Sequence, residues 1–493
     1  MTTHLLSLVL FLPLAGLAVL LAIPAENKRL VRLWANAVFL AGFLVSLPLV
    51  TTFDRNATGY QFVERASWIP SIGAQYLIGI DGISLLFVML TTVIGFLASL
   101  SSWSAIHDRA KEYYALFLLL QTALIGVFVS LDLFLFYLFF ELVLIPMYFI
   151  IGIWGGERKL YAAIKFFLYT LAGSVLMLLG VLTLYYQYRT QFGVPTFEIA
   201  RLMSLKMPLI VEMAVFWTFF IGFAIKVPMF PFHTWLPDAH TEAPTAGSVV
   251  LASVMLKMGT YGFLRFSLPL APHASTTPWV VHTMVVLSII AIIYGGLVSL
   301  VQQDWKRLVA YSSVSHLGFC TLGIFALNAN GLAGSVIQQI NHGISTGMLF
   351  LIVGVAYERR HSTKIRDYGG LATVMPNYAV VFAIALWSSA ALPLLNGFIG
   401  EFTILSGAFE ANRIYAVLAS LGVILAAAYL LWLYQRVMLG QVKHEENKLL
   451  PDLSLREWCV FLPLIAWAFW IGIYPKPYFD LLEKPVGEIL KRL

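Results

Sequence analysis

The sequence predicts an all-α integral membrane protein with about fourteen transmembrane helices. Of its 493 residues, 60% are hydrophobic and only 11% are charged, whereas soluble domains carry about 25% charged residues. Apolar runs of roughly 20 residues, the length that crosses a bilayer, recur along the whole chain. Ionisable residues nevertheless interrupt some of these runs, which predicts a function inside the membrane.

The expected spans follow one another with short connections. The first lies in MTTHLLSLVLFLPLAGLAVLLAI, which has no basic stretch before its apolar run, so we interpret it as a retained span. The seventh and twelfth spans contain prolines or glycines and are expected to be irregular. The predicted spans are 4–23, 30–52, 80–102, 113–130, 132–153, 160–186, 210–235, 244–267, 278–300, 307–327, 332–356, 371–408, 414–435 and 456–474.

The two irregular spans are five apart in this order, which suggests two five-helix repeats, spans four to eight and nine to thirteen. We therefore divide the chain into four parts. Residues 1–112 would hold three N-terminal spans, 113–267 the first repeat, 268–435 the second repeat, and 436–493 the C-terminal loop and last span. The repeats are expected to act as two half-channels.

The distribution of basic residues predicts the orientation. The odd-numbered loops and the adjoining span ends contain 18 of the 31 Lys and Arg residues, the even-numbered ones and the C-terminal tail contain 11, and two, Lys226 and Lys257, lie deep within spans. Because cytoplasmic loops carry an excess of Lys and Arg, both termini are expected outside the cytoplasm. The expected location is a bacterial inner membrane.

Four Lys and Glu residues lie deep within predicted spans: Glu141, Lys226, Lys257 and Glu401. Each unpaired charge costs roughly 2.5–3.5 kcal/mol at the bilayer centre, so four would cost about 10–14 kcal/mol, which matches the stability of a whole protein. They must therefore pair or face water inside the bundle. One Glu–Lys pair can be a simple tie between helices. Two lysines and two glutamates at similar depth favour an ion or proton path.

Polar residues accompany the central charges. Lys257 shares a helix face with Ser253 and Tyr261. His316 and His342 lie on polar faces of the tenth and eleventh spans, in YSSVSHLGF and IQQINHGIS. A lone buried histidine is more often a satisfied core residue, but two on neighbouring spans favour a relay. No cysteine or carboxylate accompanies them at ligand spacing, so no metal site is expected.

The seventh span contains FAIKVPMFPFHTWLPDAH, in which a lysine, two prolines and a histidine interrupt an apolar run. Pro228 and Pro231 remove backbone donors, so we expect no regular helix from Lys226 to His233. Broken helices at membrane depth occur where they are buried in protein or line a water-filled cavity. A second break is expected in LPLLNGFIGEF, just before Glu401. An ordinary proline kink is the alternative, but two breaks with a charge at each favour a functional role.

These charges suggest a proton switch. Low dielectric or a nearby cation lowers the pKa of a lysine, and a nearby glutamate raises it. Movement of Glu141 relative to Lys226 would therefore make that lysine hold or release a proton. Lys257 would pass protons between the halves, and Glu401 would deliver them to an exit. The sequence has no CxxC cluster, no P-loop and no dinucleotide-binding GxGxxG, so the driving energy is expected from outside this chain.

Over nearly its whole length the chain resembles the antiporter-like proton-translocating subunits of respiratory complex I, most strongly over residues 75 to 440. The resemblance rests on KVPMFPFHTWLPDAHTEAPTAGSVVLASVMLKMGTYGFLRF, FELVLIPMYFIIGIWGG, DWKRLVAYSSVSHLGF, GIDGISLLFVMLT and GFIGEF. Glu401 favours the M branch of this family, since the L and N branches and sodium/proton antiporter relatives usually carry lysine there. The chain also ends soon after its fourteenth span, without the long lateral helix expected of the L branch. As a departure, Leu394 and Leu395 follow Pro393, where the family often has glycine and threonine.

The resemblance implies fourteen helices, with two inverted five-helix repeats that each contain a broken helix. It also implies a central hydrophilic axis of Glu141, Lys226, Lys257, His316, His342 and Glu401. Glu141 and Lys226 would form the charge pair of the N-terminal half-channel. Lys257 would be the central lysine and Glu401 the terminal carboxylate.

The resemblance leaves the charged end of the seventh span less defined. His233 is a candidate relay residue, whereas Asp238 and His240 are interpreted as loop structure. The expected function is proton movement coupled to electron transfer from NADH to quinone. No cofactor is expected on this chain; FMN, iron–sulfur clusters and quinone would be bound by partner subunits, and the L-type and N-type subunits would be its neighbours in the bilayer. No nucleic-acid partner is expected.

Two alternatives stay open from the sequence. The chain could be a transport subunit of an Mrp-type sodium/proton antiporter or of a membrane-bound hydrogenase. It could also be a structural arm that moves no protons, in which case Lys226→Ala and Glu141→Ala would spare pumping.

Overall fold

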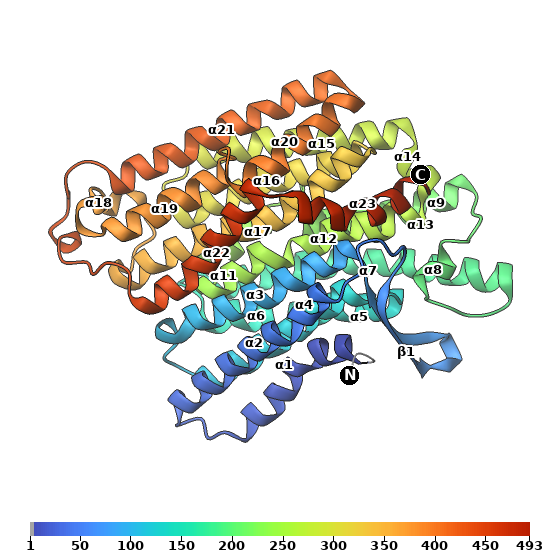
Figure 1. Ribbon diagram of the computed structural model, residues 1–493, viewed down its shortest axis with the longest axis horizontal. Coiled ribbons are helices and arrows are strands. Elements are labelled where there is room, and N and C mark those ends of the chain that lie inside the picture. Colours follow the sequence, from blue (N-terminus) through green and yellow to red (C-terminus); the bar gives the residue numbers. More distant parts are fainter. Residues whose placement is uncertain (1–3) are drawn as a thin grey trace.

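The computed structural model describes residues 4–493, and 13 of its helical segments are long and apolar enough to cross a membrane. These helices run roughly parallel to one another (Figure 1). The predicted all-α membrane fold is confirmed. Eleven of the segments are single helices: α1 (Leu5–Ala22), α2 (Lys28–Thr51), α3 (Gly82–Ala105), α4 (Ala110–Val129), α7 (Lys159–Phe192), α9 (Leu209–Lys226), α15 (Pro278–Leu300), α16 (Trp305–Phe325), α17 (Ala329–Arg360), α21 (Arg413–Met438) and α22 (Leu455–Ile473).

The fifth, eighth and twelfth expected spans are interrupted. The first two still count among the 13 segments, but neither half of the twelfth is long enough by itself. Together the two halves occupy the place of the twelfth expected span. The pieces are α5 (Leu133–Leu142) and α6 (Leu144–Trp154); α11 (Thr245–Val250), α12 (Lys257–Gly262) and α13 (Leu268–Leu270); and α19 (Pro376–Ser389) and α20 (Asn396–Ala411).

The break in the seventh span lies where the prolines predict it. Helix α9 ends at Lys226, and residues 227–234 form turns before α10 (Trp235–Glu242) begins. Pro228 and Pro231 supply no N–H group, so the helical ladder cannot continue through them. The Nε1 atom of Trp235 donates a hydrogen bond of 2.9 Å to the carbonyl oxygen of Ile225, which satisfies one acceptor that the break releases.

The second break separates α19 from α20 and is also confirmed. Residues 390–395 are non-helical, and Ala391 and Leu394 have positive φ values of 58° and 77°. The leucines after Pro393 therefore do not remove the break. Gly397 permits a close approach, because a Cβ atom there would meet the carbonyl oxygen of Ser388. The inverted relation between the two halves stays a prediction.

Several short elements were not predicted from the sequence. The connection over 53–79 forms an antiparallel hairpin of β1 (Gln61–Ile69) and β2 (Ala74–Ile80), and α23 (Lys476–Leu490) follows the last span. Hydrophobic runs of span length carry no signal for such short, partly exposed pieces. The remaining short elements are α8 (Ile199–Leu202), α14 (Pro272–Thr276), α18 (Leu371–Val374) and the 3₁₀ turns Pro70–Ile72, Ile365–Asp367 and Glu445–Asn447.

The arrangement separates lipid-facing helices from buried ones. In Figure 1, α1 and α2 lie at one edge and α21 at the opposite edge, and both labelled chain ends lie at the end of the bundle that carries the hairpin. The eighth span is 100% buried and α16 and α17 are each 94% buried, whereas α1, α21 and α22 bury only 33%. Polar side chains on the inner helices are thereby shielded from lipid.

Close packing between α3 and α23 gives a test of this fold. A Cβ atom on Gly82 would meet the carbonyl oxygen of Leu481. Gly82→Ala is therefore expected to displace α23 and to lower stability by about 1–3 kcal/mol, as overpacking does. The measurement is the melting temperature of the detergent-solubilised protein. Gly487→Ala is the control on α23 itself, because nothing lies within 4 Å of the added carbon; an equal decrease in both variants would contradict the packing argument.

Candidate functional site

Lys257 lies where the eighth span departs from a regular α-helix. The segments Leu251–Met255 and Phe263–Ser267 on either side of α12 are π-helical. The fully buried Lys257 ammonium donates to the carbonyl oxygen of Ala252, within the first π segment. Such wide turns free backbone carbonyls and re-aim side chains, and they often occur at functional sites. The sequence predicted a regular helix for the eighth span, and the structure corrects this to a helix with two π-helical segments. Hydrophobicity alone does not reveal a π turn.

The predicted polar face around Lys257 is not continuous. Ser253 donates its hydroxyl to the carbonyl oxygen of Gly343, at 2.7 Å. The Tyr261 hydroxyl instead bonds Phe128 and Ser84. The π segments rotate successive residues away from the spacing of an ideal helix, so the three side chains serve different neighbours.

Lys257 contacts one of the two predicted histidines, His342, and the other, His316, contacts Glu401 beside the second break. Its Nζ atom lies 2.6 Å from Nδ1 of His342, on α17. The His342 ring centroid is 5.9 Å from that of His316, on α16. The His316 Nδ1 atom lies 2.9 Å from Oε1 of Glu401, on α20. We call this series of four side chains the central relay: Lys257, His342, His316 and Glu401.

The bonds define which nitrogens of the central relay carry protons. A protonated Lys257 can only donate, so Nδ1 of His342 accepts and its Nε2 carries the hydrogen. Nδ1 of His316 faces a carboxylate and therefore carries a hydrogen. Its Nε2 lies 3.3 Å from the hydroxyls of Ser389 and Tyr429, which can donate to it. Each ring thus offers one donor and one acceptor along the relay.

Glu401 is held in place by the helices around the second break. Gln338 donates to Oε1 of Glu401 at 3.0 Å. A Cβ atom at Gly400 would collide with the Gln338 amide, so this glycine is needed for the approach. Asn341 donates at 2.7 Å to the carbonyl oxygen of Asn396, the first residue of α20. The other carboxylate oxygen, Oε2 of Glu401, has no hydrogen-bond partner among residues 4–493.

Glu141 and Lys226, the predicted charge pair, both lie in the first half of the bundle. Their charges interact electrostatically, yet within residues 4–493 neither the Lys226 Nζ atom nor Oε1 of Glu141 has a hydrogen-bond partner. The Lys226 ammonium lies instead over the ring of Phe140, 5.0 Å from its centroid. Phe140 is the residue just before Glu141, so the Lys226 side chain at the end of α9 lies beside that carboxylate's helix without a hydrogen bond to its Oε1 atom.

His233 and Asp238 have different surroundings. His233 is buried in the broken segment between the rings of Phe230 and Tyr294, with its Nδ1 atom unpaired among the described residues. Asp238 forms an ion pair of 2.7 Å with Lys165 on α7, and the Arg307 guanidinium lies 3.9 Å away. Asp238 therefore ties α10 to its neighbours, although it stands in a helix and not in a loop.

His240 was assigned to loop structure, and this is wrong. It lies in α10, is fully buried, and stacks on Phe350 with ring centroids 4.5 Å apart. Neither ring nitrogen has a hydrogen-bond partner among the described residues. The ring lies within electrostatic range of Lys257 and of Lys306, a buried lysine on α16 that donates to Ala243. Helical spacing from Leu236 could have indicated burial, had 235–242 been treated as helix.

The sequence of the chain is similar to that of a known family. Residues 130–426 match the family model described as NADH:quinone oxidoreductase/Mrp antiporter, TM. NADH-quinone oxidoreductase subunit M from Rhodobacter capsulatus is 47% identical over 99% of this chain and 96% of its own length. The chain belongs to the NADH-quinone oxidoreductase subunit M family. The branch predicted from Glu401 is confirmed.

Members and relatives of this family share the fold. A chain of respiratory complex I from Thermus thermophilus with bound NADH has a TM-score of 0.90 to this chain, at 32% identity and 99% coverage of both. A chain of the Mrp complex from Dietzia sp. DQ12-45-1b has a TM-score of 0.84 at 20% identity, covering 98% of this chain and 52% of that one. The latter likeness shows the fold alone. This subunit M family member is a multi-pass integral membrane protein.

Proposed function

We propose that this chain translocates protons in the membrane arm of an NADH-quinone oxidoreductase, complex I. The central relay is the observation that carries the proposal. Its four side chains come from four different segments, are all buried, and each can bind and release a proton. Ionisable groups at this depth are too costly to keep as simple packing residues.

Proton movement along the relay follows from its hydrogen bonds. Lys257 passes a proton to Nδ1 of His342, and His342 gives up the proton on its Nε2 atom. No hydrogen bond of the described residues joins the two imidazoles, so this step uses a bridging water or a ring rotation. His316 then passes a proton from Nδ1 to Glu401, whose unpaired Oε2 is the release point.

Glu141 and Lys226 would supply the switch upstream of the relay. Glu141 lies two residues before the interruption between α5 and α6, where a small shift of one helix moves its carboxylate. Movement toward Lys226 stabilises the charged lysine, and movement away favours release of its proton to Lys257. His233, beside the first break, is a candidate for the intervening transfer.

His240 and Lys306 suggest the access route to the centre. Both are buried, and His240 lies within electrostatic range of Lys306, Lys257 and His342. Lys306 is the second residue of α16, beside one of the odd loops that hold the excess of basic residues and would face the cytoplasm. Protons would thus enter from the cytoplasm, and both chain termini would lie outside it, in a bacterial inner membrane.

The energy would come from partner subunits. Electrons would pass from NADH through FMN and iron–sulfur clusters to quinone on those subunits, and L-type and N-type antiporter-like chains would flank this one. An Mrp-type antiporter subunit is the second candidate. It is less favoured, because identity to the Mrp chain is 20% against 47% for the subunit M relative, and because Glu401 occupies the place of the usual lysine.

The proposal is tested by the ratio of protons moved to electrons transferred. Inverted membrane vesicles containing the assembled complex are supplied with NADH in sodium-free medium, and proton uptake and NADH oxidation are recorded together. Glu141→Gln keeps the size of the side chain but removes its charge, so the ratio is expected to fall. Glu112→Gln, an exposed residue on α4, is the control and should leave it unchanged.

Two results would contradict the proposal. An unchanged ratio in Glu141→Gln, with normal assembly on a native gel, favours the structural-arm alternative. Proton movement that appears only when sodium is added favours the Mrp-type alternative.

A further inference from the structure

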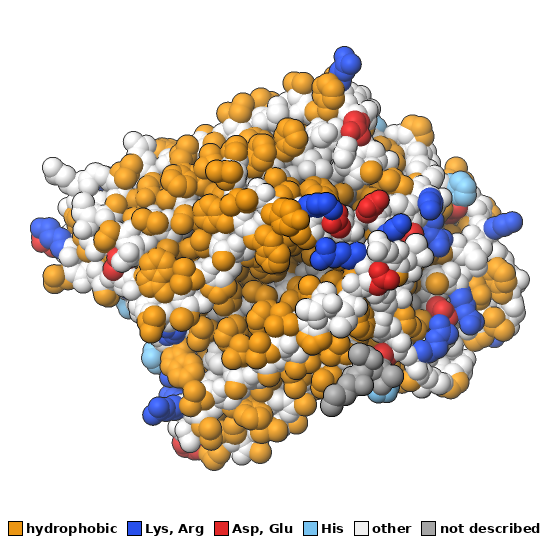
Figure 2. Space-filling view, viewed as in Figure 1, with side chains coloured by type: hydrophobic (Ala, Val, Ile, Leu, Met, Phe, Trp, Pro, Cys, Tyr) orange, Lys and Arg blue, Asp and Glu red, His pale blue; other side chains and the backbone are white. Residues whose placement is uncertain are grey.

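An apolar groove lies on the lateral face of the bundle between α2, α3, α22 and α23. Its volume is about 500 Å³, within the range of about 300–1,000 Å³ that small-molecule sites occupy. Figure 2 shows this face as a mostly hydrophobic surface that ends at a group of Lys, Arg, Asp and Glu side chains near α23. The groove therefore combines an apolar body with a charged end.

The groove has the depth of one leaflet of a bilayer. Along α3 its wall extends from Leu85 to Leu97, which is about 18 Å at 1.5 Å per residue. Half of a hydrocarbon core is about 15 Å. A partner transmembrane helix would need a contact along the full span, so the groove suits a lipid tail better.

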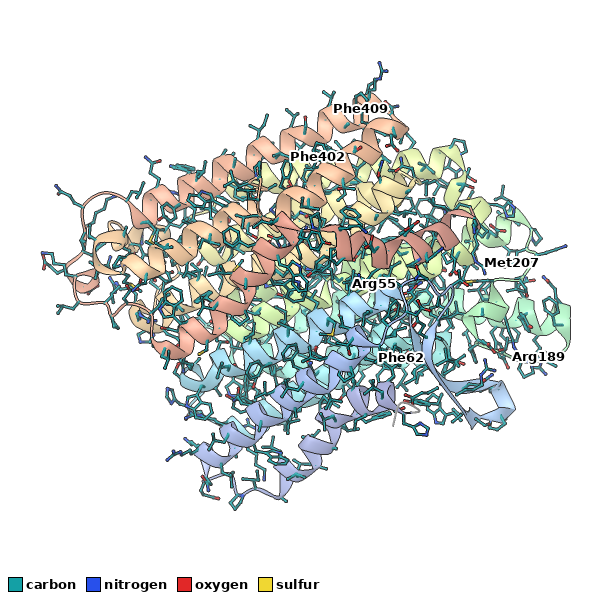
Figure 3. The ribbon with its side chains drawn as sticks, in the orientation of Figure 1. Arg55, Phe62, Arg189, Met207, Phe402 and Phe409 are labelled. Carbon is teal, nitrogen blue, oxygen red and sulfur yellow. The ribbon has the colours of Figure 1, made fainter. Side chains whose placement is uncertain are left out.

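A cation stands at the outer end of the groove. Arg55, just after α2, is exposed, lines the groove, and its guanidinium has no hydrogen bond or ion pair with the described part of the chain. Figure 3 labels it on this face. The nearby Lys476 is already paired with Asp480, at 2.8 Å. Arginine binds phosphate with two parallel hydrogen bonds, so Arg55 is free to hold a phosphate group.

Aromatic residues form the rim beside this cation. Trp467 donates from Nε1 to the hydroxyl of Tyr478 at 2.7 Å, and the rings of Trp470 and Tyr478 meet edge to face at 5.6 Å. Tryptophan and tyrosine prefer the level of lipid headgroups, where one side of the ring is apolar and the other polar. The rim thus places Arg55 at headgroup level and the apolar groove at acyl-chain level.

We propose that this groove binds one phospholipid molecule, with its phosphate on Arg55 and an acyl chain between α3 and α22. The lipid would lie between the N-terminal spans and the last span, whose residues together line the groove. This binding is independent of proton translocation, since no residue of the central relay lines the groove.

The test uses the intact complex in nanodiscs that contain a phosphatidylglycerol probe with a photoreactive diazirine in one acyl chain. After illumination, labelled peptides are identified by mass spectrometry. Peptides of α3 and α22 that line the groove are expected to be labelled more strongly than lipid-facing peptides of α1 and α21. Met89→Trp, which fills the groove, should remove this excess.

Arg55→Ala should reduce the groove labelling by roughly tenfold, as expected when charge-assisted hydrogen bonds are lost. Arg189→Ala, an equally exposed arginine at the end of α7, is the matched control and should have no effect. Labelling that is uniform over all lipid-facing helices, or that Met89→Trp leaves unchanged, would overturn the lipid site. A decrease with Met89→Trp but not with Arg55→Ala would overturn the role of Arg55. A melting curve shows that each variant is folded.

Discussion

Substitution of Lys257 by alanine is expected to stop proton translocation, with the proton-transfer step slowed by roughly 10²-fold or more, the usual contribution of a positioned acid or base. Lys257 is fully buried, its Nζ atom lies 2.6 Å from Nδ1 of His342, and in the proposed relay it hands its proton to that nitrogen. The measurement is NADH-driven acidification of inverted vesicles, followed with a pH-sensitive dye. The assembled amount of complex is compared on native gels.

The Lys257→Arg variant distinguishes a requirement for a positive charge at this position from a requirement for proton transfer. Lys257→Arg keeps a positive charge, but a guanidinium does not release its proton in proteins. If Lys257 acts as a relay, the arginine variant should fail like the alanine variant. Wild-type pumping by Lys257→Arg would instead show that only a fixed charge is required. Lys111→Ala serves as the control, because this half-buried lysine bonds only the Leu21 carbonyl among the described residues, and it should pump normally.

Substitution of Glu401 by glutamine is expected to have an effect of similar size. The amide oxygen can still accept the hydrogen bond from His316, and the neighbouring Gln338 can remain in place, so the packing is preserved. An amide does not ionise, and the relay then lacks its last proton acceptor, which should slow release by roughly 10²-fold. Single-turnover proton release from the complex measures this step directly.

Glu410→Gln offers a matched control on the same helix. Glu410 is exposed near the end of α20 and bonds only Asn330 among the described residues. Its loss should leave proton release unchanged. If Glu401→Gln and Glu410→Gln behave alike, whether both are active or both are impaired, the terminal role of Glu401 is wrong.

Much of the fold could be predicted from the sequence. Apolar runs predicted the spans. A chain in lipid must satisfy its backbone hydrogen bonds internally and therefore forms a helix, and the bilayer thickness sets the length of that helix. The breaks after Lys226 and before Asn396 followed from local chemistry, since proline lacks a donor. The hairpin over Gln61–Ile80 and α23 were missed, because short elements depend on what they pack against.

The candidate site was only partly predictable. Glu401 and the two histidines were identified from charge and depth, but their order was not: His342 contacts Lys257, and His316 contacts Glu401. Glu141 and Lys226 were identified as a charge pair, but charge and depth did not show that the Lys226 ammonium lies over the Phe140 ring. His240 was misjudged because its burial depends on Phe350, over a hundred residues away in the chain.

The sequence by itself determined that the chain spans a membrane many times, where two spans break, and which ionisable residues lie at membrane depth. These properties depend on residue type and on neighbours within a few positions. Only the tertiary structure decided which of those groups touch one another, because hydrogen bonds over 2.6–2.9 Å depend on helix rotation and on π segments that no local pattern encodes. The relay is therefore a property of packing between α12, α16, α17 and α20.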